Sequence, residues 1–203
     1  MVGVIKRMHH LRERLLWIRM GPGAAKLPPT VSRIHLEFAK RNEGGHMGPR
    51  KFMKENLPRL KFWNPAVPMI VNRTPDSEGP ATLTLYFRED GTPNPRETPQ
   101  PPSSTTGASK APAPVAGEKA VTIDIKGVYS TEILDKFIER TSAVPVQPTQ
   151  AELEEAAEIA ELRRRGEIDR AENAKLIAEK KREQARLKLA MSEAAAIKAA
   201  ATV

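Results

Sequence analysis

The chain has 203 residues, which is enough for one ordinary domain with extensions or for two small domains. Aromatic residues make up only 4% of the chain and 18 residues are proline, which favours one domain with extensions. The absence of cysteine excludes a disulfide framework, a cysteine-ligated zinc site and a thiol redox centre. Because no run of about 18 apolar residues occurs, the sequence predicts no membrane-spanning helix.

The formal net charge of +8 is concentrated near the N-terminus. Residues 1–61 hold 14 Lys/Arg against 4 Asp/Glu, whereas residues 149–203 hold 11 of each kind. A localised basic excess indicates a polyanionic partner or an anionic membrane surface. The alternative is a solvated face that like charge keeps soluble.

Residues 1–29 read as a basic N-terminal arm. Its apolar residues recur at helical spacing and predict a helix that stops at the sequence Gly21-Pro22-Gly23; they are Val4, Met8, Leu11, Leu15 and Ile18. A basic amphipathic start resembles a mitochondrial transit peptide but lacks its usual serines. We expect an uncleaved arm that both targets and binds.

Residues 30–142 read as the folded unit, which begins with a strand, a helix and a second strand. Alternating polarity over residues 31–38 predicts a half-buried strand, and the Gly-rich residues 40–48 predict a loop. A helix should start at Pro49, and Pro58 should kink or end it. Residues 66–71 predict a short strand that Pro68 makes begin late or lie at an edge.

Two more strands and a helix complete this unit. Residues 81–87 and 120–126 have strand period, and residues 131–140 predict a helix with Ser130 as its N-cap. Between the two strands, residues 91–118 are rich in proline and poor in large apolar residues, so we expect an extended or disordered insertion that decorates the domain.

The order strand, helix, strand, strand, strand, helix is that of a thioredoxin-like α/β fold. Residues 143–203 should then form a linker and a long C-terminal helix, which opens with a capping box between Thr149 and Glu152. The apolar residues of this helix keep no sustained heptad, so we expect a mostly solvated helix that reaches a neighbouring protein.

No set of residues predicts catalysis. His46 lies in the Gly-rich loop, where a hydrogen-bonding or phosphate-facing histidine is far more common than a catalyst. His9 and His10 are adjacent but have no third ligand, so we expect no metal site. We therefore expect neither an enzyme nor a cofactor nor a small-molecule substrate.

Nucleic acid fits the basic residues better, because guanidinium and ammonium groups neutralise phosphates and an aromatic ring can stack on an unpaired base. Phe62 and Trp63 are each expected either to stack on a base or to lie in the core, and for Phe62 the core is favoured. The candidate RNA-binding residues are Arg12, Arg14, Arg19, Lys26, Arg50, Lys51, Lys54, Arg59, Lys61 and Trp63.

The stretch "MGPRKFMKENLPRLKFWNPAVPMIV" resembles the signature of a family of mitochondrial ribosomal proteins whose domain is shared with a small accessory subunit of respiratory complex I. The matching positions are Gly48, Arg50, Phe52, Leu57, Pro58, Trp63, Asn64 and Pro65. The resemblance implies a thioredoxin-like domain without redox cysteines, and the preceding residues look most like the fungal large-subunit member.

The resemblance implies a structural constituent of the mitochondrial ribosome in the matrix, with the large subunit favoured, and with ribosomal RNA and neighbouring mitochondrial ribosomal proteins as partners. The alternatives are a small-subunit ribosomal protein, a complex I accessory subunit and a redox-dead thioredoxin-like enzyme, which the lack of cysteine disfavours.

Overall fold

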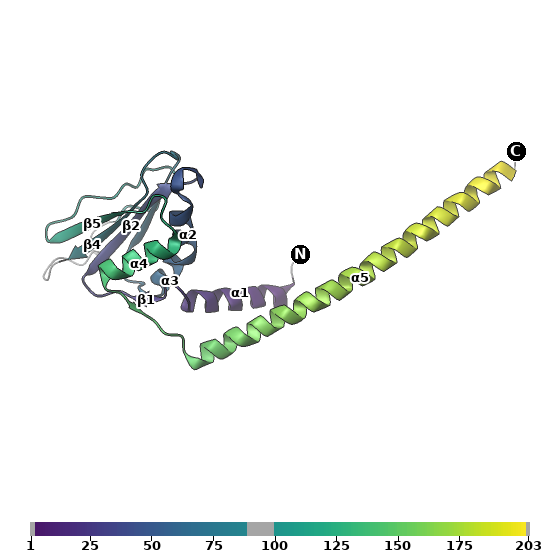
Figure 1. The fold of residues 1–203 in the computed structure, drawn as a ribbon, viewed down its shortest axis with the longest axis horizontal. Coiled ribbons are helices and arrows are strands. Elements are labelled where there is room, and N and C mark those ends of the chain that lie inside the picture. The colour runs from purple at the N-terminus through teal and green to yellow at the C-terminus, as the bar shows by residue number, and fades with distance from the viewer. Residues whose placement is uncertain (1–2, 89–99, 202–203) are drawn as a thin grey trace. The chain divides into compact units, whose positions relative to one another are not determined.

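A four-stranded sheet forms the centre of the domain in the computed structural model, which describes residues 3–88 and 100–201 (Figure 1). The chain divides into two compact units, residues 1–152 and 153–203. The strand order in the sheet is β3-β2-β4-β5. The strands are β2 (Val31–Ala39), β3 (Met69–Thr74), β4 (Thr82–Arg88) and β5 (Glu118–Asp124).

The pairing of these strands confirms the predicted order. Strand β2 pairs in parallel with β3, as a strand-helix-strand crossover requires, and antiparallel with β4. Strands β4 and β5 form the antiparallel pair that flanks the insertion. Strand β3 begins one residue after Pro68 and lies at the edge of the sheet, as the proline predicted.

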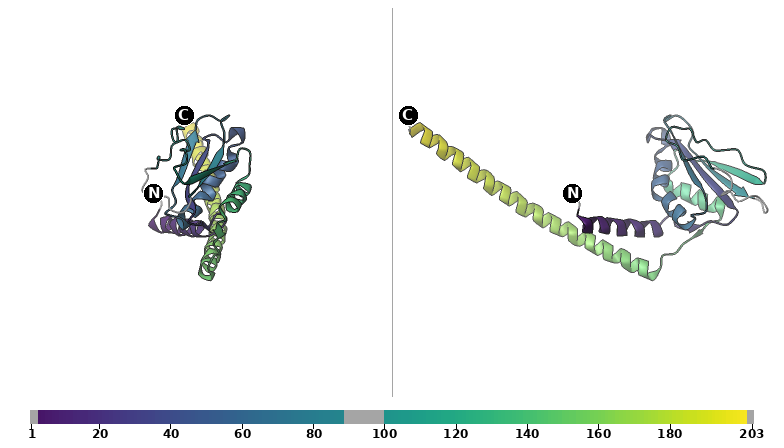
Figure 2. Two further views of the ribbon diagram at one scale, coloured as in Figure 1. Left: turned by 90° about the vertical axis from the view of Figure 1, so that its left-hand side faces the viewer. Right: turned by 180° about the vertical axis from the view of Figure 1, so that it is seen from behind.

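Helices α2 (Met47–Glu55), α3 (Leu57–Trp63) and α4 (Ser130–Thr141) lie on one side of this sheet (Figure 2). Phe52 of α2 and Phe137 of α4 are fully buried, and their ring centroids lie 6.3 Å apart. They join Ile34, Leu36, Leu83 and Leu85 in one apolar core. The arrangement confirms the expected thioredoxin-like α/β fold.

Local details of the helices differ from the predictions: α2 starts at Met47, two residues before the predicted Pro49. The break between α2 and α3 falls at Asn56, and Pro58 lies in the first turn of α3, where its missing N–H costs nothing. Ser130 was wrongly predicted as an N-cap: the cap of α4 is Tyr129, and Ser130 is its first helical residue. The Ser130 hydroxyl instead accepts a hydrogen bond from Asn56 Nδ2 (3.1 Å), so it joins α4 to the α2–α3 break.

The described part of the insertion, residues 100–117, crosses the other side of the sheet. Ser104 bonds to the backbone of β3, the Ser109 carbonyl accepts from His35 Nε2 (2.7 Å) on β2, and the Pro112 carbonyl accepts from the Tyr86 hydroxyl (2.6 Å) on β4. The segment is extended, as one of the two expectations had it; residues 91–99 lie outside the described residues. The prediction of a half-buried β2 is wrong, because this segment covers its second side and buries His35 completely.

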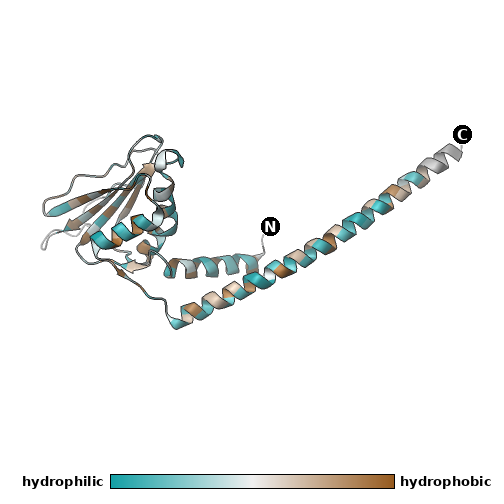
Figure 3. Cartoon of the chain, viewed as in Figure 1, coloured by the Kyte–Doolittle hydropathy of each residue, from teal (hydrophilic) through white to brown (hydrophobic). Residues whose placement is uncertain are grey.

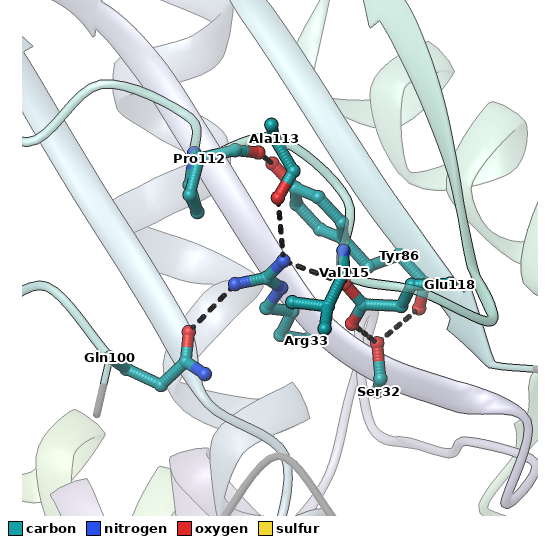
Figure 4. Close-up of polar contacts among 8 residues, drawn as sticks. All are labelled: Ser32, Arg33, Tyr86, Gln100, Pro112, Ala113, Val115 and Glu118. Carbon is teal, nitrogen blue, oxygen red and sulfur yellow. Dashed lines mark hydrogen bonds and ion pairs between the residues drawn. The ribbon is translucent and has the colours of Figure 1, made fainter. Parts of the chain in front are cut away.

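A buried ion pair secures this cover. Arg33 on β2 donates from Nη2 to Glu118 Oε2 at 2.6 Å, and the two side chains are only 5% and 9% exposed. The same guanidinium donates to Gln100 Oε1 and to the Ala113 carbonyl, and it stacks 4.1 Å from the centroid of the Tyr86 ring (Figure 4). Residues from the beginning and the end of the described insertion, and the first residue of β5, therefore all contact the Arg33 guanidinium.

The N-terminal arm is a helix and a short strand. Helix α1 (Val4–Arg19) ends before the predicted Gly21-Pro22-Gly23 stop, and β1 (Ala25–Lys26) pairs antiparallel with β6 (Val144–Pro145). A short 3₁₀ helix, η1 (Glu43–Gly45), interrupts the predicted Gly-rich loop. The end of the arm is thus hydrogen-bonded to the segment that follows α4.

Helix α5 (Gln150–Ala201) begins just before the second unit and is a single helix that makes up its described residues. Its capping box is confirmed: Thr149 N donates to Glu152 Oε2 (2.9 Å) and Glu152 N donates to Thr149 Oγ1 (3.3 Å). The Glu152 carboxylate accepts from both the backbone N–H and the hydroxyl of Thr149, and these two bonds hold the pKa of Glu152 below its ordinary value. Apolar residues are scattered along the helix rather than gathered in one continuous stripe, as Figure 3 shows, and its described side chains beyond residue 160 are almost all exposed.

Candidate nucleic-acid interface

The exposed cations of α2 are the clearest candidates for a phosphate-binding surface. Arg50, Lys51 and Lys54 are all exposed, whereas Pro49 and Phe52 of the same helix are buried. Helical spacing causes this division, since Phe52 turns into the core while Lys51 and Lys54 lie three residues apart on the outer side. Arg50 also donates to the Lys40 carbonyl, which orients its guanidinium beside the end of β2.

Arg59 has a different position from the other predicted RNA contacts. It is 7% exposed, and it donates from Nε to the Trp17 carbonyl (2.9 Å) and from Nη1 to the Pro22 carbonyl (2.8 Å). Its guanidinium carbon lies 4.1 Å from the Trp17 ring centroid. Burial lowers the pKa of Arg59, and nearby Glu55 partly offsets this effect. The side chain therefore fastens α1 to α3, and its donors point to the protein's own arm.

The Phe62–Trp63 pair lies at the end of α3. Phe62 is 47% exposed, so the prediction that it is a core residue is wrong; its ring meets Trp63 edge-on at 5.5 Å. Trp63 is half-buried, and its indole Nε1 donates to the Arg19 carbonyl (2.9 Å). With Pro65 and Arg88 it lines a hollow of about 420 Å³, so part of its ring surface faces a space outside the core.

The remaining candidates are exposed on the arm and at the end of α3. Arg12, Arg14, Arg19 and Lys26 are exposed, and the Lys26 ammonium lies 5.7 Å from the Trp63 ring centroid. Lys61 is exposed too, but its ammonium donates to the Pro65 and Val67 carbonyls. The structure thus brings Arg19, Lys26, Arg59 and Trp63 together where α1, α3 and β1 meet.

The apolar stripe that the sequence predicts on α1 does not form the contact of this helix with the domain. Leu16 is buried and Trp17 stacks on Arg59, whereas Val4, Met8, Leu11 and Leu15 are 44% to 64% exposed. Sequence reasoning missed Leu16 and Trp17, because the stripe at helical spacing pointed to another side of the helix. One side of α1 therefore presents apolar surface to solvent.

The signature residues that sequence reasoning quoted have mainly structural positions. A Cβ on Gly48 would lie 1.7 Å from the Val128 carbonyl oxygen, so only glycine allows α2 to start against the β5–α4 turn. Asn64 is buried, accepts a hydrogen bond from Leu27 N, and donates to the Ala25 and Leu60 carbonyls. The signature therefore mostly encodes how the helices dock, and its exposed cation is Arg50.

His46 is a hydrogen-bonding residue, one of the two expected roles. Its ring is fully buried, accepts from Ala39 N at Nδ1 (3.2 Å) and donates from Nε2 to the Ser77 carbonyl (3.0 Å). In the described ranges, no three His, Asp or Glu side chains gather in a way that could hold a metal ion. Nor does any described helix combine the length and apolar character needed to cross a membrane.

The chain thus combines a thioredoxin-like domain without cysteine and exposed cations on α1 and α2, the class of domain that the signature stretch led us to expect. Comparison with protein families supports this class: residues 49–127 match the mitochondrial ribosomal protein L51 / S25 / CI-B8 domain. This range runs from the first turn of α2 through β5, and it includes the insertion and every signature position except Gly48.

Individual relatives define the family further. The chain is 56% identical over 200 residues to large ribosomal subunit protein mL61 of Neurospora crassa, a match that covers 98% of this chain and 99% of that protein. It is 34% identical over 71 residues to large ribosomal subunit protein mL61 of Schizosaccharomyces pombe, covering 34% of this chain and 53% of that protein. The chain belongs to this family of mitochondrial ribosomal proteins, and it is a structural protein and not an enzyme.

Proposed function

We propose that this protein is a constituent of the large subunit of the mitochondrial ribosome, in the matrix, where it binds ribosomal RNA and neighbouring ribosomal proteins. The observation that carries the RNA contact is the exposed row of cations on α2, in a family of ribosomal proteins. The full-length similarity to a large-subunit protein supports this subunit over the small one and over a complex I subunit.

The RNA contact of the domain is assigned to its exposed cations. The proposed phosphate-binding residues are Arg12, Arg14, Arg19, Lys26, Arg50, Lys51, Lys54 and Lys61. Arg59 acts through its neighbours, because it fixes α1, and with it Arg19, beside α3. Trp63 offers the part of its ring that lines the hollow with Arg88 for stacking on a base.

Protein neighbours fit two other surfaces. The exposed apolar residues of α1 and the scattered apolar residues of α5, such as Leu162, Leu176 and Leu187, can each be covered by another protein chain. Within the domain, the sheet offers little of this kind, because the helices cover one side and the insertion covers much of the other.

A salt titration tests the RNA contact. Lys51→Ala/Lys54→Ala should reduce the slope of log affinity against log salt for a large-subunit ribosomal RNA fragment by about 1.5, roughly 0.7 to 0.9 for each phosphate that a lysine no longer neutralises. The matched control is Lys119→Ala/Lys136→Ala, which removes two exposed lysines from β5 and α4. Equal slopes for the two double variants would mean that α2 is only a solvated face.

Deletion of residues 149–203 tests the protein contact. The remaining domain should melt cooperatively, since the second unit begins at Leu153, and it should sediment less with large subunits on a sucrose gradient. Loss of cooperative melting would show instead that α5 belongs to the core. Normal sedimentation of the truncated protein with large subunits would contradict the proposal that α5 contacts a neighbouring protein.

A further inference from the structure

Charge is divided along α5. Residues 150–162 contain five glutamates and no Lys/Arg, whereas residues 163–188 contain ten Lys/Arg and five Asp/Glu. A helix dipole favours acidic residues in the first turns, but this preference fades within one turn. The basic stretch starts several turns into the helix, so the dipole does not explain it.

The cations of this stretch also gather on one side of the helix. One row has successive intervals of 7, 11 and 7 residues, close to two, three and two whole turns, and consists of Arg163, Arg170, Lys181 and Lys188. A second row lies about 100° further round, with intervals of 11, 7 and 4 residues, and consists of Arg164, Lys175, Arg182 and Arg186. All eight side chains are exposed.

The strip between the two rows is nearly free of bulky side chains. Its residues within 163–188 are Glu167 and four alanines, Ala171, Ala174, Ala178 and Ala185. The other four acidic residues of the stretch lie outside the two rows: Asp169 lies opposite the basic side, and Glu172, Glu179 and Glu183 lie beyond the second row. Arg165 also points there and is paired with Glu161.

We propose that this basic face of α5, residues 163–188, is a second RNA-binding surface that takes the phosphate backbone of a ribosomal RNA helix. Two cation rows flanking a low strip allow the helix to approach closely while long side chains reach phosphates on either side. At about 1.5 Å per residue the face is about 38 Å long. Eight cations with one carboxylate among them complement a polyanion, and RNA carries such charge continuously along its backbone.

This surface deepens the proposed ribosomal function and rests on it, but its residues belong to α5 and not to α2. It also divides the roles of α5: the basic face is assigned to RNA, and Leu162, Leu176 and Leu187, which lie on another side, are left for a protein neighbour.

The test compares two double variants of the full chain. Each substituted position of one variant is the sequence neighbour of a substituted position of the other. Arg164→Gln/Lys181→Gln removes two charges from the basic face, and Arg165→Gln/Lys180→Gln removes one Arg and one Lys from the other side. Gln, Lys and Arg have similar helix propensities, so far-ultraviolet circular dichroism should be equal for both. The probe is a labelled RNA duplex of about 20 base pairs, slightly longer than the roughly 16 that a double-stranded-RNA-binding domain spans.

The basic-face variant should reduce the slope of log affinity against log salt by about 1.5, since each phosphate contact contributes about 0.7 to 0.9, and the control variant should leave it nearly unchanged. An equal reduction of the slope in both variants would show an effect of total charge and would overturn the proposal. No reduction in either, while Lys51→Ala/Lys54→Ala still lowers the slope, would overturn this proposal and leave the α2 contact standing. Normal RNA binding by a basic-face variant that no longer enters ribosomes would assign the face to an acidic protein and also overturn it.

Discussion

The ion pair between Arg33 and Glu118 offers the sharpest test of how the insertion is held. In Glu118→Ala, the Arg33 guanidinium stays under the insertion, where it is 5% exposed, but loses its carboxylate partner. Glu118 also accepts from Ser32 Oγ (2.5 Å) and Val115 N (3.2 Å), so the substitution removes three hydrogen bonds (Figure 4). Removing one member of a buried pair costs about 3–5 kcal/mol, a large part of a typical folding free energy of about 5–15 kcal/mol.

Urea unfolding followed by tryptophan fluorescence measures this destabilisation. Both tryptophans of the chain, Trp17 and Trp63, lie in the first unit, so the signal is independent of α5. Trypsin should also cleave faster after Lys110, which lies in the part of the insertion that Arg33 and Tyr86 hold. The double variant Arg33→Met/Glu118→Leu should recover much of the stability, because no charge is left buried.

A small effect would refute this reasoning. If Glu118→Ala costs less than about 1 kcal/mol, the value typical of an exposed ion pair, the insertion does not shield the pair from water. Equal destabilisation by Glu118→Ala and by the double variant would show that the packing of the aliphatic stems, and not the buried charge, accounts for the effect.

Three further predictions concern single residues. Burial lowers the pKa of His35, so below about pH 6.5 the unfolded chain takes up a proton on this residue that the folded chain does not. The free energy of unfolding should therefore fall as the pH drops toward 5, by up to about 1.4 kcal/mol per pH unit. A pH series of urea unfolding curves should show a shallower fall in His35→Gln. Arg59→Lys should free α1 from α3 and shift the Trp17 emission to the red while lowering stability by about 1–3 kcal/mol; unchanged emission would show that other contacts hold the arm. Gly48→Ala should destabilise the domain by about 3 kcal/mol or more in thermal melts. The control Gly166→Ala should not, because the added Cβ has no neighbouring atom within 4 Å. A domain that tolerates both substitutions would refute the close approach of Gly48 to Val128.

Local patterns were enough to predict most elements of the domain. Apolar alternation located β4 and β5, and Pro68 predicted that β3 begins late or lies at an edge. The spacing of Thr149 and Glu152 predicted the start of α5. These features depend on residues that are close together in the chain, because strand period, proline geometry and helix capping act over a few residues. The signature stretch likewise identified the family, which the relatives confirmed.

The candidate site was predicted less completely, because exposure depends on segments that are distant in sequence. Arg59 looks like any other cation of the signature stretch, yet α1, some 40 residues earlier, covers it. Phe62 looks like a core residue, yet nothing in the described chain packs over it sufficiently to bury it.

The same dependence on distant segments explains why the prediction of a half-buried β2 was wrong. Its alternating side chains are typical of a strand with one side in water, but the backbone carbonyls of residues 100–117 cover that side, and Arg33 there pairs with Glu118 of β5. A sequence determines by itself which residues can share a strand or a helix face, because that depends on backbone period alone. Which of those faces is covered is decided only by the tertiary structure, because the energy of burying His35 or Arg33 comes from partners far along the chain.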